Sequence, residues 1–286
     1  MPKTAILLIT CPDRKGLVAA IANFLVAHNA NILHADQHQD NELSLFFMRV
    51  EFDLAGFQLD EAQFRTAFQP IAQANAMTWQ LEFTDRKPAI AIFVSQHLHC
   101  LADLLLRQAA GELSCNIAMI ISNHEDAQPL STFYGIPFHL IAVTPDTRAH
   151  AEQAQLELLA SPTTEPIDLI VLARYMQVLS PEFVARYPRR IINVHHSFLP
   201  AFTGARPYHA AFARGVKLIG STSHYVTEVL DDGPIIEQDV TRISHSDQIP
   251  DLVQKGRDME RIVLSRAVRW HLEHRILSYA NKTVVF

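Results

Sequence analysis

The stretch Thr84-Asp85-Arg86-Lys87-Pro88, followed by Ala89-Ile90-Ala91-Ile92-Phe93-Val94-Ser95, decides how this chain is organised. Its first five residues are polar or charged and end in proline, a composition typical of a linker. The next seven form a mostly apolar run with the length of a buried strand. The hydrophobic pattern differs on the two sides of the linker, so we expect one domain at residues 1–84 and a second at residues 85–286.

On the C-terminal side of the linker, short buried-type strands alternate with helical stretches. Strands are expected at Ala89–Ser95, Cys115–Ser122, Phe138–Ile141, Leu169–Leu172, Ile191–His195, Ile219–Tyr225 and Ile235–Thr241. Helices are expected at Cys100–Ala110, Asp146–Ala160, Pro181–Tyr187 and from about Ile249 to His274. This alternation predicts an α/β domain with a Rossmann-like, mostly parallel sheet wrapped by helices and a site at the carboxyl ends of the strands.

The N-terminal side has the pattern of a compact α+β unit. Strands are expected at Thr4–Thr10, Asn31–Gln39, Leu43–Phe52 and Met77–Phe83. One helix begins near Leu17, and a second carries Phe57, Phe64 and Ile71 on its apolar face. The resulting order, β-α-β-β-α-β, is that of the ferredoxin-like fold.

The composition excludes several classes of protein. Hydrophobic residues make up 49% of the 286 residues and charged residues 19%, which is typical of a globular chain rather than a disordered or fibrous one. The net charge of −6 provides no bulk attraction for phosphate backbones, so no nucleic-acid partner is expected. No Cys-x-x-Cys pair, membrane-spanning apolar run or signal-peptide cleavage site is present, which predicts a soluble cytoplasmic protein.

Asn193-Val194-His195 is the segment best suited to chemistry. Residues i and i+2 of a strand point to the same side, so the Asn193 amide and the His195 imidazole share one face at a strand end. An amide can donate a hydrogen bond to a carbonyl oxygen and an imidazole can transfer a proton, which together suit attack on an acyl or formyl carbon. His196 is expected to face the opposite way in a supporting role. The residues alone leave open that this polar pair merely caps the sheet.

Leu230-Asp231-Asp232-Gly233-Pro234 is a loop with two carboxylates before a tight turn. A carboxylate held there near an imidazole could orient it and favour its protonated form. An Asp-Asp-Gly-Pro sequence is also typical of an ordinary surface turn, and the residues alone do not decide between the two.

Several of these segments, in this order, carry a resemblance to a known superfamily. Asn193-Val194-His195, Phe198-Leu199-Pro200, His224-Tyr225-Val226-Thr227 and Leu230 to Ile236 resemble the signature of the folate-dependent formyltransferases, which use 10-formyltetrahydrofolate. The resemblance implies that Asn193, His195 and Asp231 are catalytic and that His224 supports them. It implies that the folate is bound by Leu172, Met176, Gln177, Val178, Leu179, Phe183, Val226 and Thr227.

The chain departs from that superfamily after its expected strand Ala89–Ser95. Glycinamide ribonucleotide formyltransferases have a glycine-rich loop there, which holds the phosphate of the acceptor. This chain has Gln96-His97-Leu98-His99-Cys100 instead, without a glycine. A phosphorylated organic acceptor therefore has no obvious binding site, and water remains as the nucleophile.

The N-terminal pattern carries a second resemblance. Cys11-Pro12-Asp13-Arg14-Lys15-Gly16-Leu17-Val18 with His28-Asn29-Ala30-Asn31-Ile32 resembles an ACT domain, a regulatory module that often pairs between subunits. The resemblance implies a homo-oligomer and a possible amino-acid effector bound by Asp13, Gly16, Asn31 and Ile32, near a helix N-terminus where a carboxylate is favoured.

Both domains in this order resemble the formyltetrahydrofolate deformylase family. The runs His195 to Phe202 and Ala205-Arg206-Pro207-Tyr208-His209 are also more similar to that family than to the transferases. The resemblance implies hydrolysis of 10-formyltetrahydrofolate to formate and tetrahydrofolate, which balances the one-carbon folate pool and supplies formate for purine biosynthesis. It implies no cofactor besides this substrate, no metal and no membrane partner.

Two alternatives remain at this point. The first is a formyltransferase acting on a small amine, which would use the same catalytic residues. The second is a folate- and amino-acid-binding sensor without turnover, against which the complete set Asn193, His195 and Asp231 argues. A metal site is not expected. His97-x-His99 and His34-x-x-x-His38 could each supply two ligands, but neither has a third ligand at an obvious spacing, which favours a structural or solvent-facing role.

Overall fold

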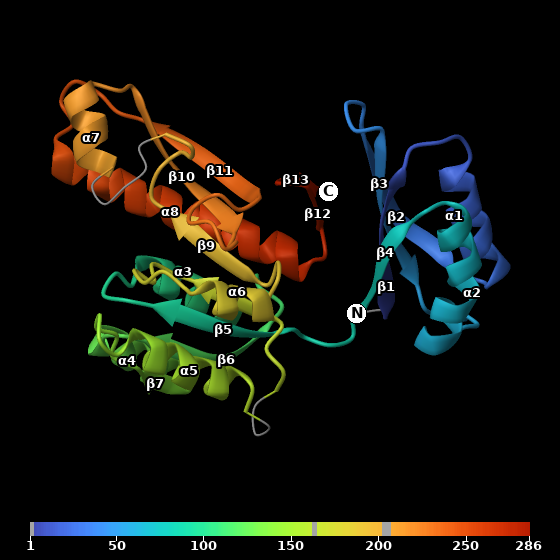
Figure 1. Cartoon of the computed structure of the whole chain (residues 1–286), viewed down its shortest axis with the longest axis horizontal. Helices are drawn as coiled ribbons and strands as arrows, with labels where there is room; N and C mark the ends of the chain where they lie inside the picture. Colours follow the sequence, from blue (N-terminus) through green and yellow to red (C-terminus); the bar gives the residue numbers. More distant parts are fainter. Residues whose placement is uncertain (1–2, 162–164, 202–206) are drawn as a thin grey trace. The chain divides into compact units, whose positions relative to one another are not determined.

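The computed structural model describes residues 3–161, 165–201 and 207–286, so the motif residues Phe202, Ala205 and Arg206 lie outside the described part. The contacts between residues divide the chain into two compact units, drawn in Figure 1. The first comprises Met1–Lys87 together with Glu273–Tyr279 and Thr283–Phe286. The second comprises Pro88–Leu272 and Ala280–Lys282. Each unit is described by itself.

The first unit is an antiparallel sheet with two helices. Its elements are β1 (Thr4–Pro12), α1 (Leu17–Ala27), β2 (Asn31–Asp40), β3 (Leu45–Asp53), α2 (Glu61–Ala74) and β4 (Thr78–Phe83). Its strands follow the order β2-β3-β1-β4 in the described residues, with β2 at one edge. Local sequence sets the helix starts: Asp60 and Gln63 form a capping box at α2, and Gly16 precedes α1 with a φ of 93° that favours glycine. The predicted β-α-β-β-α-β order is observed.

Each face of this sheet has its own apolar cluster. The helices α1 and α2 cover one face, where Phe24, Phe64 and Phe68 are buried among the side chains of β1 and β3. The C-terminal hairpin of β12 (Ile276–Tyr279) and β13 (Lys282–Val285) supplies the other cluster, in which Leu277 contacts Ile6, Leu8 and Phe47. The C-terminal residues of the chain thus complete the core of the N-terminal domain.

Polar contacts fix the hairpin to the same sheet. Tyr279 donates a hydrogen bond to Oδ2 of Asp40 at 3.0 Å, and Nε of Arg49 donates one to the His274 carbonyl oxygen at 3.0 Å. The sequence did not predict this hairpin, whose chain segment we had expected to belong to the second domain.

The second unit is built on a seven-stranded sheet in the described residues, with the order β11-β10-β9-β8-β5-β6-β7. Its parallel part comprises β5 (Ala89–Val94), β6 (Asn116–Ser122), β7 (Phe138–Leu140), β8 (Leu169–Leu172) and β9 (Ile191–His195). The strands β10 (Leu218–Tyr225) and β11 (Ile235–Arg242) extend it in antiparallel fashion. The predicted α/β fold with a mostly parallel sheet is confirmed.

Helices precede or follow the strands of this sheet along the chain. They are α3 (His99–Ala109), η1 (Glu125–Ala127), α4 (Gln128–Tyr134), α5 (Arg148–Leu159), α6 (Pro181–Arg186), α7 (Pro207–Arg214) and α8 (Ile249–Leu272). Ser180 caps the start of α6, because its hydroxyl accepts a hydrogen bond from the Phe183 amide, and Pro181 occupies the first turn. The sequence analysis missed η1, α4 and α7.

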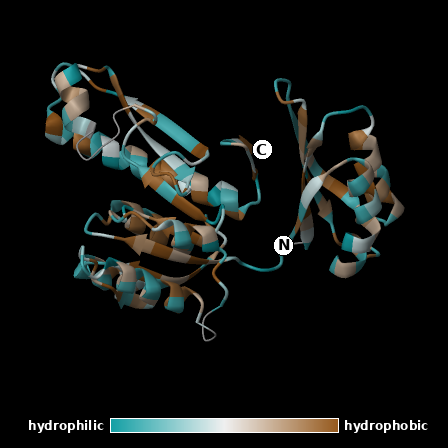
Figure 2. Ribbon diagram, in the orientation of Figure 1, coloured by the Kyte–Doolittle hydropathy of each residue, from teal (hydrophilic) through white to brown (hydrophobic). Residues whose placement is uncertain are grey.

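The central strands of this sheet are almost entirely apolar, as Figure 2 shows by their brown colour. All residues of β5 and of β8 are buried, as expected for strands covered on both faces. The long α8 helix presents Leu252, Val263 and Val268 to the interior, and the charged Glu260 lies on the same buried side. In the described ranges, no helix is both long and apolar enough to cross a membrane.

Candidate active site

Asn193 and His195 lie on β9, on the face that also carries His224 from the neighbouring strand. In the antiparallel pairing of β9 and β10, Asn193 stands directly opposite His224 and His195 opposite Thr222. Nδ2 of Asn193 is 3.2 Å from Nε2 of His224. The alternation of side chains along the two strands therefore gathers an amide and two imidazoles, as predicted for Asn193 and His195.

The loop after β10 returns the carboxylate of Asp231 to these imidazoles. Oδ2 of Asp231 is 3.2 Å from Nδ1 of His195, and its Oδ1 is 3.7 Å from Nε2 of His224. Asp231 has a φ of 56°, a left-handed conformation that Asp and Asn tolerate better than most residues. At Gly233, a Cβ would lie 1.7 Å from the Tyr225 carbonyl oxygen, so only glycine lets the loop close at this point.

The hydrogen bonds define the protonation of these groups. The pKa of Asp231 is held well below its usual value, chiefly by the hydrogen bond from His195, so its carboxylate is ionised at neutral pH. An ionised carboxylate accepts a hydrogen bond from Nδ1–H of His195, and in this tautomer of the imidazole Nε2 has a lone pair. Nε2 of His195 is buried and has no hydrogen-bond partner among the described residues, so it is available to a substrate or a water molecule.

His224 orients the Asn193 amide. Its Nδ1 is 3.0 Å from the Tyr225 carbonyl oxygen, which can only accept, so Nδ1 carries the proton. Nε2 of His224 then accepts from the amide NH2 group of Asn193, whose second N–H remains free for another acceptor.

A cavity of about 590 Å³ adjoins these residues. Besides Asn193, His195, His196, His224 and Asp231 it is lined by Leu172, Arg174–Leu179, Val194 and Val226–Leu230. Met176, Val178, Val229 and Leu230 are apolar side chains about half or more exposed to solvent, an arrangement that suits a flat organic ligand. Seven of the eight predicted folate-binding residues line the cavity.

Phe183 is the exception, and its predicted place in the lining is wrong. It is completely buried, and its ring packs at 6.1 Å from that of Phe93 and at 6.0 Å from that of Tyr187. It belongs to the core behind the cavity because it lies in the first turn of α6, on the side that faces the sheet.

His196 also differs from the prediction, because β9 ends at His195 and the alternation of side chains ends with it. The His196 ring stacks on that of His195 with 5.1 Å between centroids and lines the same cavity. Burial lowers the pKa of His196 to about 4, with a further contribution from the charge of Arg174, so this ring is neutral at pH 7.

A buried carboxylate on α8, which the sequence analysis missed, lies behind this part of the cavity wall. Glu260 is 1% exposed and accepts hydrogen bonds from Nε2 of His99 at 2.7 Å and from the Tyr208 hydroxyl at 2.9 Å. Nε of Arg174 lies 3.4 Å from its Oε2, at ion-pair distance but without hydrogen-bond geometry. Burial raises the pKa of Glu260, but the hydrogen bond from His99 and the charge of Arg174 outweigh it, and the net pKa lies below the usual value. The sequence did offer a sign that Glu260 is important, because a glutamate on the buried stripe of an amphipathic helix needs a polar or charged partner.

Ligand atoms of His99, Cys100 and Glu260 lie within 4.8 Å of one another, a grouping that could in principle hold a metal ion. The other interactions of these residues argue against a bound metal ion. Burial raises the pKa of the Cys100 thiol well above its usual value, so it is protonated, and the Arg174 guanidinium already compensates the Glu260 charge. The donor set therefore fits a hydrogen-bonded network better than a cation site.

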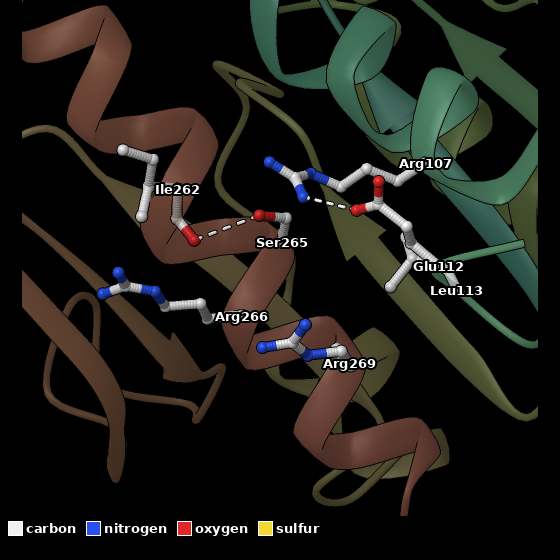
Figure 3. A pocket seen from close by; sticks show the side chains of 7 residues that line it. All are labelled: Arg107, Glu112, Leu113, Ile262, Ser265, Arg266 and Arg269. Carbon is white, nitrogen blue, oxygen red and sulfur yellow. Dashed lines mark hydrogen bonds and ion pairs between the residues drawn. The ribbon is translucent and has the colours of Figure 1, made fainter. Parts of the chain in front are cut away.

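A second, smaller cavity of about 260 Å³ lies between α3 and α8, as Figure 3 shows. Arg107, Arg266 and Arg269 line it, but Arg107 pairs with Asp103 and Glu112, and Arg266 pairs with Asp239 at 3.0 Å. None of its lining residues belongs to the group around His195. It is a surface cavity with largely compensated charge rather than a second reaction site.

The four residues predicted to bind an amino acid lie at two different ends of the first unit's sheet. In the strand register, Asn31 and Thr4 both pair with Asp53 of β3. At the other end of β3, Pro12 and Asp40 both pair with Leu45. At about 3.3 Å per residue, roughly 26 Å separates the two ends. Asp13 and Gly16 follow β1 at one end, and Asn31 and Ile32 begin β2 at the other, so one copy of the unit does not bring all four together.

Comparison with known proteins matches both units to known families. Residues 88–268 match the formyl transferase family and residues 5–68 match the ACT domain. A formyltetrahydrofolate deformylase of Synechocystis sp. is 52% identical over 283 residues, which cover 99% of this chain and 98% of that protein. The chain belongs to the formyltetrahydrofolate deformylase family.

Solved structures agree with membership of the deformylase family. The crystal structure of a formyltetrahydrofolate deformylase from Pseudomonas syringae pv. tomato superposes with a TM-score of 0.96 at 47% identity and covers 100% of this chain and 95% of that one. A glycinamide ribonucleotide transformylase from Symbiobacterium toebii reaches a TM-score of 0.65 at 26% identity, covering 72% of this chain and 98% of that one. The transformylase thus lacks a counterpart to about a quarter of this chain.

Proposed function

We infer that this chain hydrolyses 10-formyltetrahydrofolate to formate and tetrahydrofolate. The observation that carries this inference is the unpartnered Nε2 of His195, beside the Asn193 amide, with Nδ1 of the same ring 3.2 Å from the ionised Asp231. This is a proton-transfer group next to a hydrogen-bond donor for an oxyanion, in a cavity large enough for a folate head group. Membership of the deformylase family over nearly the whole chain supports the same reaction.

In the first step, water attacks the formyl carbon. We propose that the Asn193 amide N–H donates a hydrogen bond to the formyl oxygen, where negative charge develops. Nε2 of His195 takes a proton from the attacking water as the new C–O bond forms. Asp231 stabilises the resulting imidazolium, and the neutral His196 ring beside it adds no opposing positive charge.

In the second step, the bond between the formyl carbon and the folate nitrogen breaks. The imidazolium of His195 returns its proton to the leaving nitrogen, so that tetrahydrofolate and formate are released. Leu172, Met176–Leu179, Val226 and Thr227, which line the cavity, would contact the folate on its apolar faces. Phe183 would support them from the core.

The direct test is a formate assay with purified protein and 10-formyltetrahydrofolate as the only organic reactant. We expect formate and tetrahydrofolate in equal amounts. Absence of formate with full recovery of the substrate would contradict the inference. Tetrahydrofolate formation only upon addition of an amine, with a formylated amine as the second product and no free formate, would favour a formyltransferase, the alternative that shares the same residues and that no comparison favours over a deformylase.

We propose that the reaction needs no metal and no cofactor besides its folate substrate. Proton transfer by His195 and charge stabilisation by Asn193 and Asp231 account for both steps. Overnight dialysis against a metal chelator should leave the rate of formate release unchanged, whereas a loss that zinc or another divalent cation restores would assign a role to the group of His99, Cys100 and Glu260.

We propose that the first unit binds an amino-acid effector between two copies of the chain. The strand β2 is a ten-residue edge strand whose side chains are mostly exposed on both faces. Antiparallel pairing of two such edges would bring Asn31 and Ile32 of one copy to the end of the sheet where Asp13 and Gly16 of the other copy lie. We also propose a cytoplasmic location, with which the buried free thiols of Cys11 and Cys100 agree.

A further inference from the structure

The structure offers an explanation for why water, rather than an amine, receives the formyl group. The relevant residues surround Glu260, which the proposed mechanism does not use. Glu260 lies on α8, Tyr208 on α7, His99 at the first position of α3, and Arg174 in the segment after β8. Four separate segments therefore contribute to one buried ionic network.

This network lies at the carboxyl end of β5, where α3 begins. The amino end of an α-helix attracts anions, because its first N–H groups are unpaired and the helix dipole is positive there. Leu98, which precedes α3, forms no side-chain cap. The carboxylate of Glu260 is hydrogen-bonded to His99 in the first turn of this helix, so the protein places its own negative charge beside the helix start.

The same network forms the back of the cavity wall next to His195. Arg174 and His196 line the cavity, the Arg174 guanidinium faces Glu260, and the His196 ring is 6.1 Å from the ring of Tyr208. Nε2 of His99 and the Tyr208 hydroxyl are hydrogen-bonded to Glu260, and the Arg174 charge is matched by it. A phosphate arriving here would find the donors of His99 and Tyr208 engaged, the charge of Arg174 compensated and a buried negative charge behind them.

The backbone is adapted to this arrangement at Gly256, one turn before Glu260 on α8. A Cβ at this position would lie 2.0 Å from the Tyr208 hydroxyl oxygen. Glycine thus lets the Tyr208 ring cross the helix closely enough for its hydroxyl to reach Glu260.

We propose that the Glu260 carboxylate acts as a built-in anion that closes the acceptor side of the site to phosphorylated amines and so leaves water as the nucleophile. This proposal rests on the proposed hydrolysis. Glu260 is a specificity-determining residue in this scheme and does not touch the reacting atoms. Its charge, and not only its volume, performs the exclusion.

The test uses ribose 5-phosphate as a probe and measures its inhibition of formate release by the full-length chain. The wild type should not be inhibited by a large molar excess of the probe. Glu260→Gln keeps the shape but leaves the Arg174 guanidinium without its counter-charge. The probe should therefore inhibit this variant at concentrations at least about tenfold lower than the wild type, as expected when a like charge is removed from beside an anion.

Two control variants distinguish the effect of the lost Glu260 charge from a general disturbance of the structure. Glu157→Gln makes the same change on the exposed side of α5 and should behave as the wild type. The double variant Glu260→Gln with Arg174→Gln removes the freed cation as well and should lose the acquired inhibition.

Either of two results would overturn the proposal. One is competitive inhibition of the wild type by ribose 5-phosphate, which needs no variant and decides the matter if Glu260→Gln does not fold. The other is a folded, active Glu260→Gln variant that is no more sensitive to the probe than Glu157→Gln. Failure of the proposed function is a different result, namely a wild type that releases no formate from the substrate alone.

Discussion

The residues around His195 act as a group because each one sets the tautomer or the orientation of its neighbour. The Tyr225 carbonyl sets the tautomer of His224, His224 orients the Asn193 amide, and Asp231 sets the tautomer of His195. The consequence is one free amide N–H and one free imidazole nitrogen on the same side of β9. Removal of either should therefore affect the reaction more than the fold.

Asn193→Ala and His195→Ala should each lower kcat about a hundredfold or more, the scale of losing an oxyanion donor or a proton-transfer group. The measurement is the rate of formate release at saturating substrate, with the thermal unfolding midpoint recorded for each variant. Thr227→Ala, which alters a cavity-lining residue away from the reacting atoms, is the matched control and should change KM more than kcat. Near-normal kcat in either alanine variant would contradict the proposed roles.

Asp231 should contribute to stability in a pH-dependent way. Its pKa is depressed in the folded state, so its contribution is present above the unfolded pKa of about 3.9 and is lost as the pH falls through the lower folded value. Asp231→Asn, which also tolerates the positive φ, should lower the urea midpoint at pH 7, and this difference from the wild type should shrink as the pH falls below 4. A difference that is constant or grows toward acid pH would show that the Asp231 carboxylate is not stabilised by His195.

Sequence reasoning identified those residues whose neighbours are set by the strand pattern. Asn193 and His195 were found from the two-residue repeat of a strand, while the roles of Asp231 and His224 came from the resemblance. Glu260 was missed because its partners His99, Tyr208 and Arg174 come from three distant segments. His196 was misplaced because the end of β9 lies one residue before it, and strand ends are the least regular part of the pattern.

At the scale of the element, the strands that were predicted well are those with uninterrupted apolar runs, such as β5 and β8. The hairpin β12–β13 was not recognised because its turn, Ala280-Asn281, contains one common turn residue but neither glycine nor proline. Ala280 adopts a φ of 45° there, a conformation that usually calls for glycine or asparagine. The two strands are only four residues each and contain polar residues, so the alternation was too short to stand out.

The hairpin should stabilise the first unit measurably. Leu277 is 9% exposed and contacts Ile6, Leu8 and Phe47, so Leu277→Ala should cost about 2 kcal/mol, the lower end for a buried leucine. Denaturant unfolding can be followed by the fluorescence of Trp79 in the first unit, in a Trp270→Phe background that removes the other of the two tryptophans. Val26→Ala, an exposed position on α1, is the control and should have little effect. An equal, small change in both variants would mean that the hairpin contributes no stability to this sheet.

At the scale of the whole molecule, sequence patterns predict elements but not which distant elements pack together. The linker after Thr84 suggested where one domain ends, and the chain contacts divide between Lys87 and Pro88. Nothing in the sequence indicated that residues 273–279 and 283–286 pack with the N-terminal sheet. Removal of residues 1–84 alone would therefore leave Leu277 and Tyr279 without their contacts.

The separation of Asp13 from Asn31 in the strand register leads to a prediction about assembly. If two chains pair along β2, a charge introduced in this edge should dissociate them and abolish amino-acid binding together, because each site takes residues from both copies. Leu33 is 49% exposed on β2, and Leu33→Lys places like charges at the paired edge. Light scattering should show half the wild-type mass, and amino acids that raise the unfolding midpoint of the wild type should no longer do so. Val26→Lys, equally charged but on α1, should keep the wild-type mass and response. A Leu33→Lys variant of unchanged mass would exclude β2 as the interface, and one that dissociates but still binds amino acids would show that the effector site is complete within a single chain.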